Sequence, residues 1–71
     1  MAKIPITLTI NGRERQMPSE LSLPALLTEL GVDRRMVAVA HNGDVIPRAT
    51  YDDVTLRDGD RVEVVRMVGG G

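Results

Sequence analysis

The sequence closes with Val68-Gly69-Gly70-Gly71, and this segment holds the strongest candidate for chemistry in the chain. Glycine has no Cβ, so its backbone can enter a narrow channel and adopt φ values that other residues avoid. Four extended residues reach about 13 Å, which is enough to thread into the active site of a partner protein. A terminal α-carboxylate is ionised at neutral pH and is a poor electrophile. We therefore expect Gly71 to react only after another molecule has activated it.

Other candidates for catalysis are few. The sequence has no cysteine, which excludes disulfides, thiolate metal ligands and a cysteine nucleophile. His41 is the only histidine, and a metal site needs several ligands at matched spacing, so we predict no catalytic or metal-binding role for it. We expect it at the surface or in a turn. The loop carboxylates are interpreted as turn residues that bond to nearby backbone N–H groups. They are Asp52, Asp53, Asp58 and Asp60.

The sequence also lacks a nucleotide-binding motif. Lys3 is the only lysine, and no G-x-x-x-x-G-K-[ST] segment is present. We therefore expect the chain to bind no cofactor of its own, and we expect an activator of Gly71 to be a second protein. The arginines form either an ordinary solvated face or a docking surface that works through charge complementarity. They are Arg34 and Arg35, with Arg13, Arg15, Arg48, Arg57, Arg61 and Arg66.

Length and composition limit the class of protein. A chain of 71 residues forms one small domain, which buries about 60% of its unfolded surface. Its net charge of −1 argues against general attraction to nucleic acid. No apolar run approaches the roughly 20 residues that span a bilayer, and no signal-peptide core follows Met1, so we expect a cytoplasmic protein. Tyr51 is the only aromatic residue, so we predict a core of Ile, Leu, Val, Met and Ala.

The first half of the chain predicts a hairpin followed by a helix. Apolar residues alternate over 4–10, which is typical of a strand, and Pro5 favours a sheet edge or a strand beginning. Asn11-Gly12 predicts a tight turn into a returning strand over 13–17. Leucines spaced three and four apart then predict a helix over 23–30, with Ser22 as N-cap. Pro24 suits its first turn and Gly31 its left-handed C-cap.

The second half predicts short strands joined by turns. We expect strands over 36–41, 45–46 and 61–67, a loop over 49–54 with one 3₁₀ turn, and turns at Asn42-Gly43 and 58–60. One amphipathic helix over one face of a mixed sheet would bury every apolar stripe. We therefore predict an α+β fold with four to five strands, the ubiquitin-like β-grasp, over residues 1–67, in which the last strand returns to the centre beside the first. Residues 68–71 are expected to form a flexible tail.

Strand parity predicts an exposed apolar surface next to this tail. If Val62 and Val64 face the helix, Val65 and Met67 point to the opposite side of the sheet. Ala38 and Ala40 share that side by their own parity. The surface is suited to partner docking, because methionine adapts to different contacts. The alternative is ordinary scatter of apolar residues over the surface.

The chain resembles the ubiquitin-like sulfur carriers over its whole length. The segments that carry the resemblance are residues 26–31 (LLTELG), 37–48 (VAVAHNGDVIPR), 56–64 (LRDGDRVEV) and Gly70-Gly71. The glycine pair marks the wider family. The Asn-Gly…Val-Ile-Pro-Arg and Asp-Gly-Asp segments favour the thiamine-biosynthesis (thiazole) branch over the molybdopterin branch.

This resemblance implies a protein co-substrate and not an enzyme. An adenylyltransferase similar to ubiquitin-activating enzymes would use ATP to adenylate the Gly71 carboxylate. Sulfur from a cysteine desulfurase or a related donor would displace AMP, so that Gly71 carries a thiocarboxylate, and thiazole synthase would accept the sulfur. Gly70 and Gly71 would be the functional pair, Gly69 a spacer, and Val68 part of the segment that partners recognise.

Other functions remain open at this point. The chain could carry sulfur for another pathway, such as molybdopterin synthesis or tRNA thiolation, with the same chemistry at Gly71. It could instead be a ubiquitin-like modifier that forms isopeptide bonds through Gly71, or a plain interaction module. We expect no nucleic-acid or membrane partner.

Overall fold

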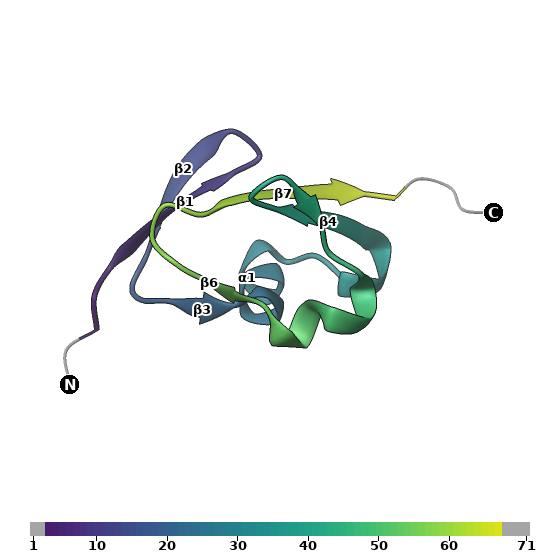
Figure 1. Cartoon of the computed structure of the whole chain (residues 1–71), viewed down its shortest axis with the longest axis horizontal. Helices are drawn as coiled ribbons and strands as arrows, with labels where there is room; N and C mark the ends of the chain where they lie inside the picture. The colour runs from purple at the N-terminus through teal and green to yellow at the C-terminus, as the bar shows by residue number, and fades with distance from the viewer. Residues whose placement is uncertain (1–2, 68–71) are drawn as a thin grey trace.

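A computed structural model describes residues 3–67 of the chain. Its main sheet has five strands in the order β2-β1-β7-β4-β5, and helix α1 packs against one face of it (Figure 1). The strands are β1 (Ile6–Ile10), β2 (Arg13–Met17), β4 (Val37–His41), β5 (Asp44–Val45) and β7 (Arg61–Arg66), and the helix is α1 (Leu23–Leu30). Strand β7 pairs in parallel with β1 and antiparallel with β4. The predicted return of the last strand to the centre of the sheet is confirmed.

Two asparagine–glycine turns set the register of the sheet. Asn11 and Gly12 have φ values of 51° and 82°, and Asn42 and Gly43 have φ values of 51° and 89°. Both pairs therefore adopt the left-handed conformation that a two-residue hairpin turn requires. The Asn11 side chain also reaches the central strand, because its Oδ1 accepts from the Val64 N–H at 2.8 Å. This amide ties the first hairpin to β7.

Helix α1 begins and ends at the residues that the sequence predicts. Ser22 is the N-cap, and its Oγ accepts a hydrogen bond from the Ala25 N–H at 3.2 Å. Gly31 ends the helix in the left-handed region, with φ of 74°. The buried face of α1 consists of Leu23, Leu26 and Leu27.

The core contains one residue type that the sequence analysis excluded. Tyr51 is 1% exposed and is the largest fully buried side chain, and its hydroxyl donates to the Val37 carbonyl at 3.2 Å. The remaining core residues are Ile6, Leu8, Ile10, Met17, Leu23, Leu26, Leu27, Val37, Val39, Leu56 and Val62. No alanine among residues 3–67 belongs to this core. The prediction of a purely aliphatic core was wrong, because a tyrosine can be buried when its hydroxyl finds an acceptor.

Several boundaries differ from prediction. Strand β1 begins at Ile6, directly after Pro5, and lies inside the sheet, so the strand-beginning interpretation of Pro5 is confirmed and the edge interpretation is wrong. Met36 belongs to a 3₁₀ turn, η1 (Arg34–Met36), and not to β4. The 3₁₀ turn expected in the 49–54 loop is present as η2 (Arg48–Asp53), which begins one residue before that loop. The predicted short strand falls one residue earlier, at β5.

A second, two-stranded sheet was not predicted. It joins β3 (Leu21–Ser22) to β6 (Thr55–Leu56) in antiparallel pairing. Two-residue strands carry no detectable alternation, so only the fold brings them together. In the described part of the chain, none of the helices has the length and apolarity needed to cross a bilayer.

Candidate functional site at the end of strand β7

Strand β7, at the centre of the sheet, leads into the predicted functional segment. Pairing with the neighbouring strand continues one residue beyond β7, because the Met67 N–H donates to the Met36 carbonyl at 2.8 Å. Met67 is therefore held at the edge of the folded body. Residues 68–71, with the predicted sites Val68, Gly69, Gly70 and Gly71, lie outside the described residues.

The predicted apolar surface is present beside this strand end. Val65 pairs with Ala38 across β7 and β4, and its side chain is 61% exposed. Ala38 is exposed and Ala40 is half-buried, whereas Val39 between them is buried against α1. Met67 is 43% exposed. The four residues named from parity therefore lie on the side of the sheet away from the helix.

Strand β5 adds a residue to this surface that the sequence analysis missed. Val45 pairs with Ala40 and is 78% exposed, which makes it the most exposed large apolar side chain among residues 3–67. A shallow hollow of about 180 Å³ lies between Ala38, Ala40, Val45 and Val65. We call Ala38, Ala40, Val45, Val65 and Met67 the apolar patch. A two-residue turn at Asn42-Gly43 pairs residue 40 with residue 45, so this turn could have assigned Val45 to the same side of the sheet as Ala40.

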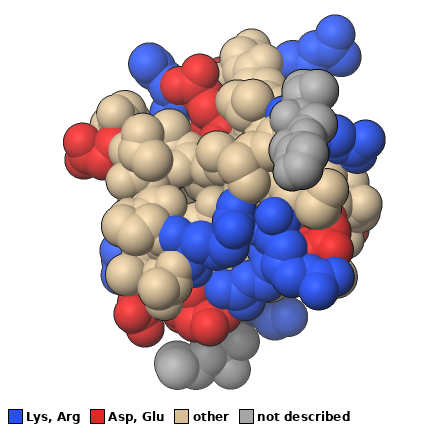
Figure 2. All heavy atoms as spheres, turned by 90° about the vertical axis from the view of Figure 1, so that its right-hand side faces the viewer, with Lys and Arg blue, Asp and Glu red and all other residues tan. Residues whose placement is uncertain are grey.

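Arginines from three segments gather at the same end of the molecule. Arg66 is the last residue of β7 and pairs with Val37, which directly follows η1, the 3₁₀ turn that contains Arg34 and Arg35. Arg48 reaches this end from η2, because its Nη2 lies 3.8 Å from the Met67 sulfur. Figure 2, which faces the side of the molecule where β7 ends, shows Lys and Arg side chains joined into a continuous area. We call Arg34, Arg35, Arg48 and Arg66 the arginine end.

Two of these arginines are paired with aspartates. Arg34 lies 2.8 Å from Asp52, and its guanidinium stacks 5.6 Å from the centre of the Tyr51 ring. Arg35 lies 3.0 Å from Asp33. Hydrogen bonds from the Arg35 side chain and backbone hold the pKa of Asp33 below its ordinary value. Among residues 3–67, no carboxylate lies within ion-pair distance of the other two arginines, Arg48 and Arg66.

His41 and Asp60 form a contact that sequence reasoning did not foresee. His41 Nε2 lies 2.8 Å from Asp60 Oδ2, and the two side chains are only 21% and 17% exposed. His41 ends β4 directly before the Asn42-Gly43 turn and links this turn to the one at Asp60, so the turn alternative of the prediction is confirmed. Asp60 accepts from the nearby Arg57 N–H at 2.9 Å, which confirms its turn-residue interpretation. Asp58 also lies in this turn, but its carboxylate accepts from the Thr7 N–H of β1, 51 positions away, at 2.8 Å.

The remaining loop carboxylates do not assemble a catalytic site. Asp52 forms the ion pair with Arg34, and Asp53 is an exposed residue of η2. Within residues 3–67 no group of three or more His, Cys, Asp or Glu side chains could hold a metal ion.

Comparison with known proteins places this geometry in a family. A model of the ThiS family matches residues 7–71, which include the helix, the glycine segment and all of the sheet except Ile6, the first residue of β1. The chain belongs to the ThiS family. Among solved structures, the thiamine biosynthesis protein ThiS of Geobacter metallireducens superposes with a TM-score of 0.81 at 36% identity. The match covers 93% of this chain and 100% of that one, so the ubiquitin-like β-grasp fold is confirmed.

Relatives of this ThiS-family chain fall into two size classes. The sulfur carrier protein ThiS of Thermus thermophilus is 39% identical over 62 residues, which cover 87% of this chain and 95% of that protein. The thiazole synthase of Paramagnetospirillum magneticum is 47% identical over 64 residues, or 90% of this chain. That match covers only 20% of the synthase, so the chain spans about one fifth of the length of this relative.

Proposed function

We propose that this protein is a sulfur carrier for thiazole formation in thiamine biosynthesis and acts as a co-substrate of partner enzymes. The observation that carries the proposal is the ThiS-family match, which extends through Gly70 and Gly71. The sulfur carrier proteins named ThiS in other bacteria, which match over nearly their full length, support the same function.

The chemistry we propose takes place at the Gly71 carboxylate. A partner adenylyltransferase joins this carboxylate to the α-phosphate of ATP, which releases pyrophosphate and leaves an acyl-adenylate. A donor such as a cysteine desulfurase supplies the sulfur as a persulfide. A thiol reductant cleaves the S–S bond, is oxidised to a disulfide and releases hydrosulfide, which then attacks the carbonyl carbon. AMP leaves, and Gly71 ends in a thiocarboxylate. AMP and sulfur are therefore carried in turn on Gly71, and the folded body supplies no catalytic group to either step.

We propose thiazole synthase as the acceptor of the sulfur. Two proteins named thiazole synthase contain a segment similar to this chain, which matches 20% and 19% of their lengths. In those proteins a ThiS-like segment is joined covalently to the rest of the chain. This arrangement supports direct transfer from Gly71 to a synthase of the same kind.

The apolar patch is proposed as a surface that these enzymes contact. Val65 and Met67 lie next to the strand end from which the glycine segment departs, so an enzyme that takes Gly71 must come close to them. The variant Val65→Asp should weaken binding to the adenylyltransferase about tenfold or more, because a charge would be buried at the contact. Its unfolding midpoint should stay near that of the wild type, since the side chain is 61% exposed. Unchanged binding would exclude a role for the patch.

Intact mass spectrometry of protein purified from its native host tests the function directly. A sulfur carrier should show exchange of one oxygen for sulfur, located at Gly71 by fragmentation, and the signal should disappear when Gly70-Gly71 is deleted. Gly71 found joined to lysines of other proteins would indicate a modifier. Thiamine-independent growth of a strain that carries only the deletion variant would refute the proposal.

A further inference from the structure

The partner that takes Gly71 must meet one particular end of the molecule, and this step rests on the proposed function. Met67 is anchored to Met36 through its backbone. The four residues that follow can reach no more than about 13 Å. An enzyme surface that surrounds Gly71 therefore lies within that distance of Met67, against the arginine end as well as against the apolar patch.

The arginine end carries an excess of positive charge. Arg34 and Arg35 are balanced by Asp52 and Asp33. In the described part of the chain, no carboxylate lies within ion-pair distance of Arg48 or Arg66. The chain as a whole has a net charge of −1, so this local excess reflects how the fold distributes charge.

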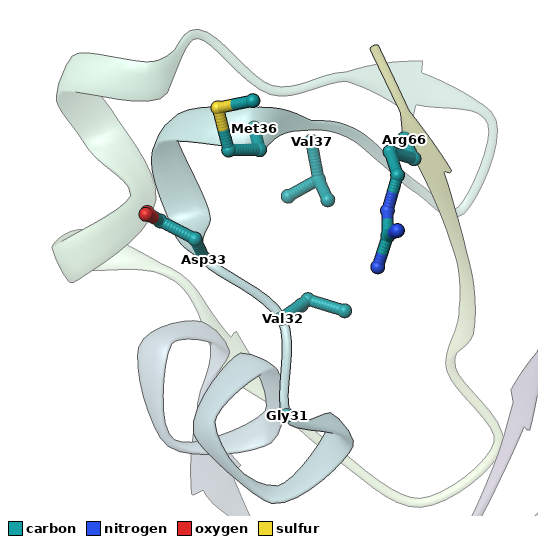
Figure 3. Close-up of a pocket in the computed structure, with 6 residues that line it drawn as sticks. All are labelled: Gly31, Val32, Asp33, Met36, Val37 and Arg66. Carbon is teal, nitrogen blue, oxygen red and sulfur yellow. The ribbon is translucent and has the colours of Figure 1, made fainter. Parts of the chain in front are cut away.

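A hollow of about 300 Å³ adjoins Arg66. Its walls are formed by Val32, Met36, Val37 and the side chain of Arg66, with Gly31 and Asp33 at its border (Figure 3). Met36 is 53% exposed although it is a large apolar side chain. Arginine and methionine are both enriched in protein–protein contacts, where an apolar centre is surrounded by a polar rim.

We propose that the arginine end docks onto an acidic protein surface of the enzyme that takes Gly71. Carboxylates of that enzyme would pair with Arg48 and Arg66, and an apolar side chain of the same surface would enter the hollow between Arg66 and Met36. A guanidinium pairs with a carboxylate through two parallel hydrogen bonds, which fixes the orientation of the two proteins. The glycine segment would then be aimed at the active site before it enters.

The two parts of this surface have separate kinetic consequences. Exposed charges steer association, and their effect falls as salt screens them. Apolar contacts form after the encounter and act mainly on dissociation. The surface therefore predicts an arginine effect on the association rate and a Met36 effect on the dissociation rate.

Binding kinetics of the full chain with its adenylyltransferase test the proposal. In about 0.02 M NaCl, the double variant Arg48→Glu/Arg66→Glu should associate on the order of tenfold more slowly than the wild type. Raising NaCl to about 0.3 M should remove most of this difference. Arg48→Gln/Arg66→Gln should show a smaller loss. Met36→Ser should dissociate about fivefold faster with little change in association.

A matched control makes the same change of charge at two arginines elsewhere on the molecule. Arg13 and Arg15 are exposed residues of β2, the edge strand that β1 and β7 separate from β4. The variant Arg13→Glu/Arg15→Glu should associate within about twofold of the wild-type rate. Equal slowing by both double variants would overturn the proposal, because it would show only a dependence on net charge.

Two further measurements separate the docking proposal from the proposed carrier function and from nucleic-acid binding. Formation of the Gly71 acyl-adenylate by the wild type at saturating enzyme tests the proposed function separately from the docking surface. If this product forms but the arginine variants associate normally, the docking proposal is wrong and the carrier function stands. Tighter binding of a mixed-sequence single-stranded oligonucleotide than of the enzyme would also overturn the proposal, since the arginine end would then select nucleic acid.

Discussion

Replacement of Asp60 by asparagine should destabilise the fold, because the Asp60 carboxylate accepts hydrogen bonds from donors in two different turns. Asp60 Oδ2 contacts His41 at 2.8 Å and accepts from the Arg57 N–H at 2.9 Å. Its Oδ1 accepts from the Asn42 side chain at 3.2 Å. The carboxylate is only 17% exposed, so solvent screens these bonds weakly.

The magnitude follows from the charge of the acceptor. Hydrogen bonds to a charged group contribute about 1.5–3 kcal/mol, against about 0.5–1.5 kcal/mol between neutral groups. An asparagine at position 60 would keep one acceptor oxygen. Its NH2 group, which is a donor, would take the place of the second oxygen and face the N–H groups that this oxygen accepts from. We therefore expect Asp60→Asn to lower the free energy of unfolding by about 2 kcal/mol. In a domain of this size the melting temperature should fall by about 8–16 °C.

The pH dependence has a defined sign. Burial raises the pKa of Asp60, but the bonds from His41, from the Arg57 N–H and from Asn42 outweigh burial and leave the pKa below its ordinary value. The charged form therefore stabilises the folded state above the unfolded pKa of about 3.9. This contribution is lost as the pH falls through the lower folded-state pKa. The difference in stability between wild type and Asp60→Asn should accordingly shrink at acid pH.

Urea unfolding followed by circular dichroism, at neutral pH and in steps down to a pH of about 3, measures both effects. The control is Asp53→Asn, an exposed carboxylate with no ion partner among residues 3–67, which should change the stability by less than about 0.5 kcal/mol. A penalty for Asp60→Asn that is equally small, or that stays constant across the pH range, would refute the reasoning.

Two further substitutions test the core and the helix end. Tyr51→Phe removes the hydroxyl that donates to Val37 in the core, so the free energy of unfolding should fall by about 1–2 kcal/mol in urea; an unchanged midpoint would show that this bond contributes nothing. Gly31→Ala places a Cβ at φ of 74° with no atom within 4 Å to obstruct it, so only backbone strain is added. We expect a loss of about 1 kcal/mol by thermal melting, and a gain in stability would contradict the left-handed cap.

Much of the fold could be predicted because its signals are local. Helix α1 has its cap residues and its leucine spacing within ten consecutive positions, and both ends fall where they were expected. The Asn11-Gly12 and Asn42-Gly43 turns are encoded by the need for positive φ. Strand parity located the exposed face of β7 and β4 for the same reason, since alternation is a local property.

The features that prediction missed depend on contacts between distant segments. Tyr51 bonds to a carbonyl 14 positions away, and His41 meets Asp60 across 19 positions. Neither residue carries a sign of its partner in its own neighbourhood. The β3–β6 pair likewise forms only because the chain returns past α1. Val45 is the exception, because the hairpin register already assigned it to the exposed face.

The sequence by itself therefore determined helix α1, the five strands of the main sheet, their order along the chain and the segment proposed for chemistry at Gly71. Periodicity, caps and turns are written in neighbouring residues, and the glycine segment needs no tertiary contact to be recognised. Strand parity also located the apolar surface beside that segment, but only the tertiary structure decided which charges accompany it. It brought Arg48 of η2 and Arg66 of β7 to the same end of the molecule, with Arg66 lining the hollow beside Met36. The physical reason is that charge and apolar surface act through distances in space, which the order of residues along a chain does not specify.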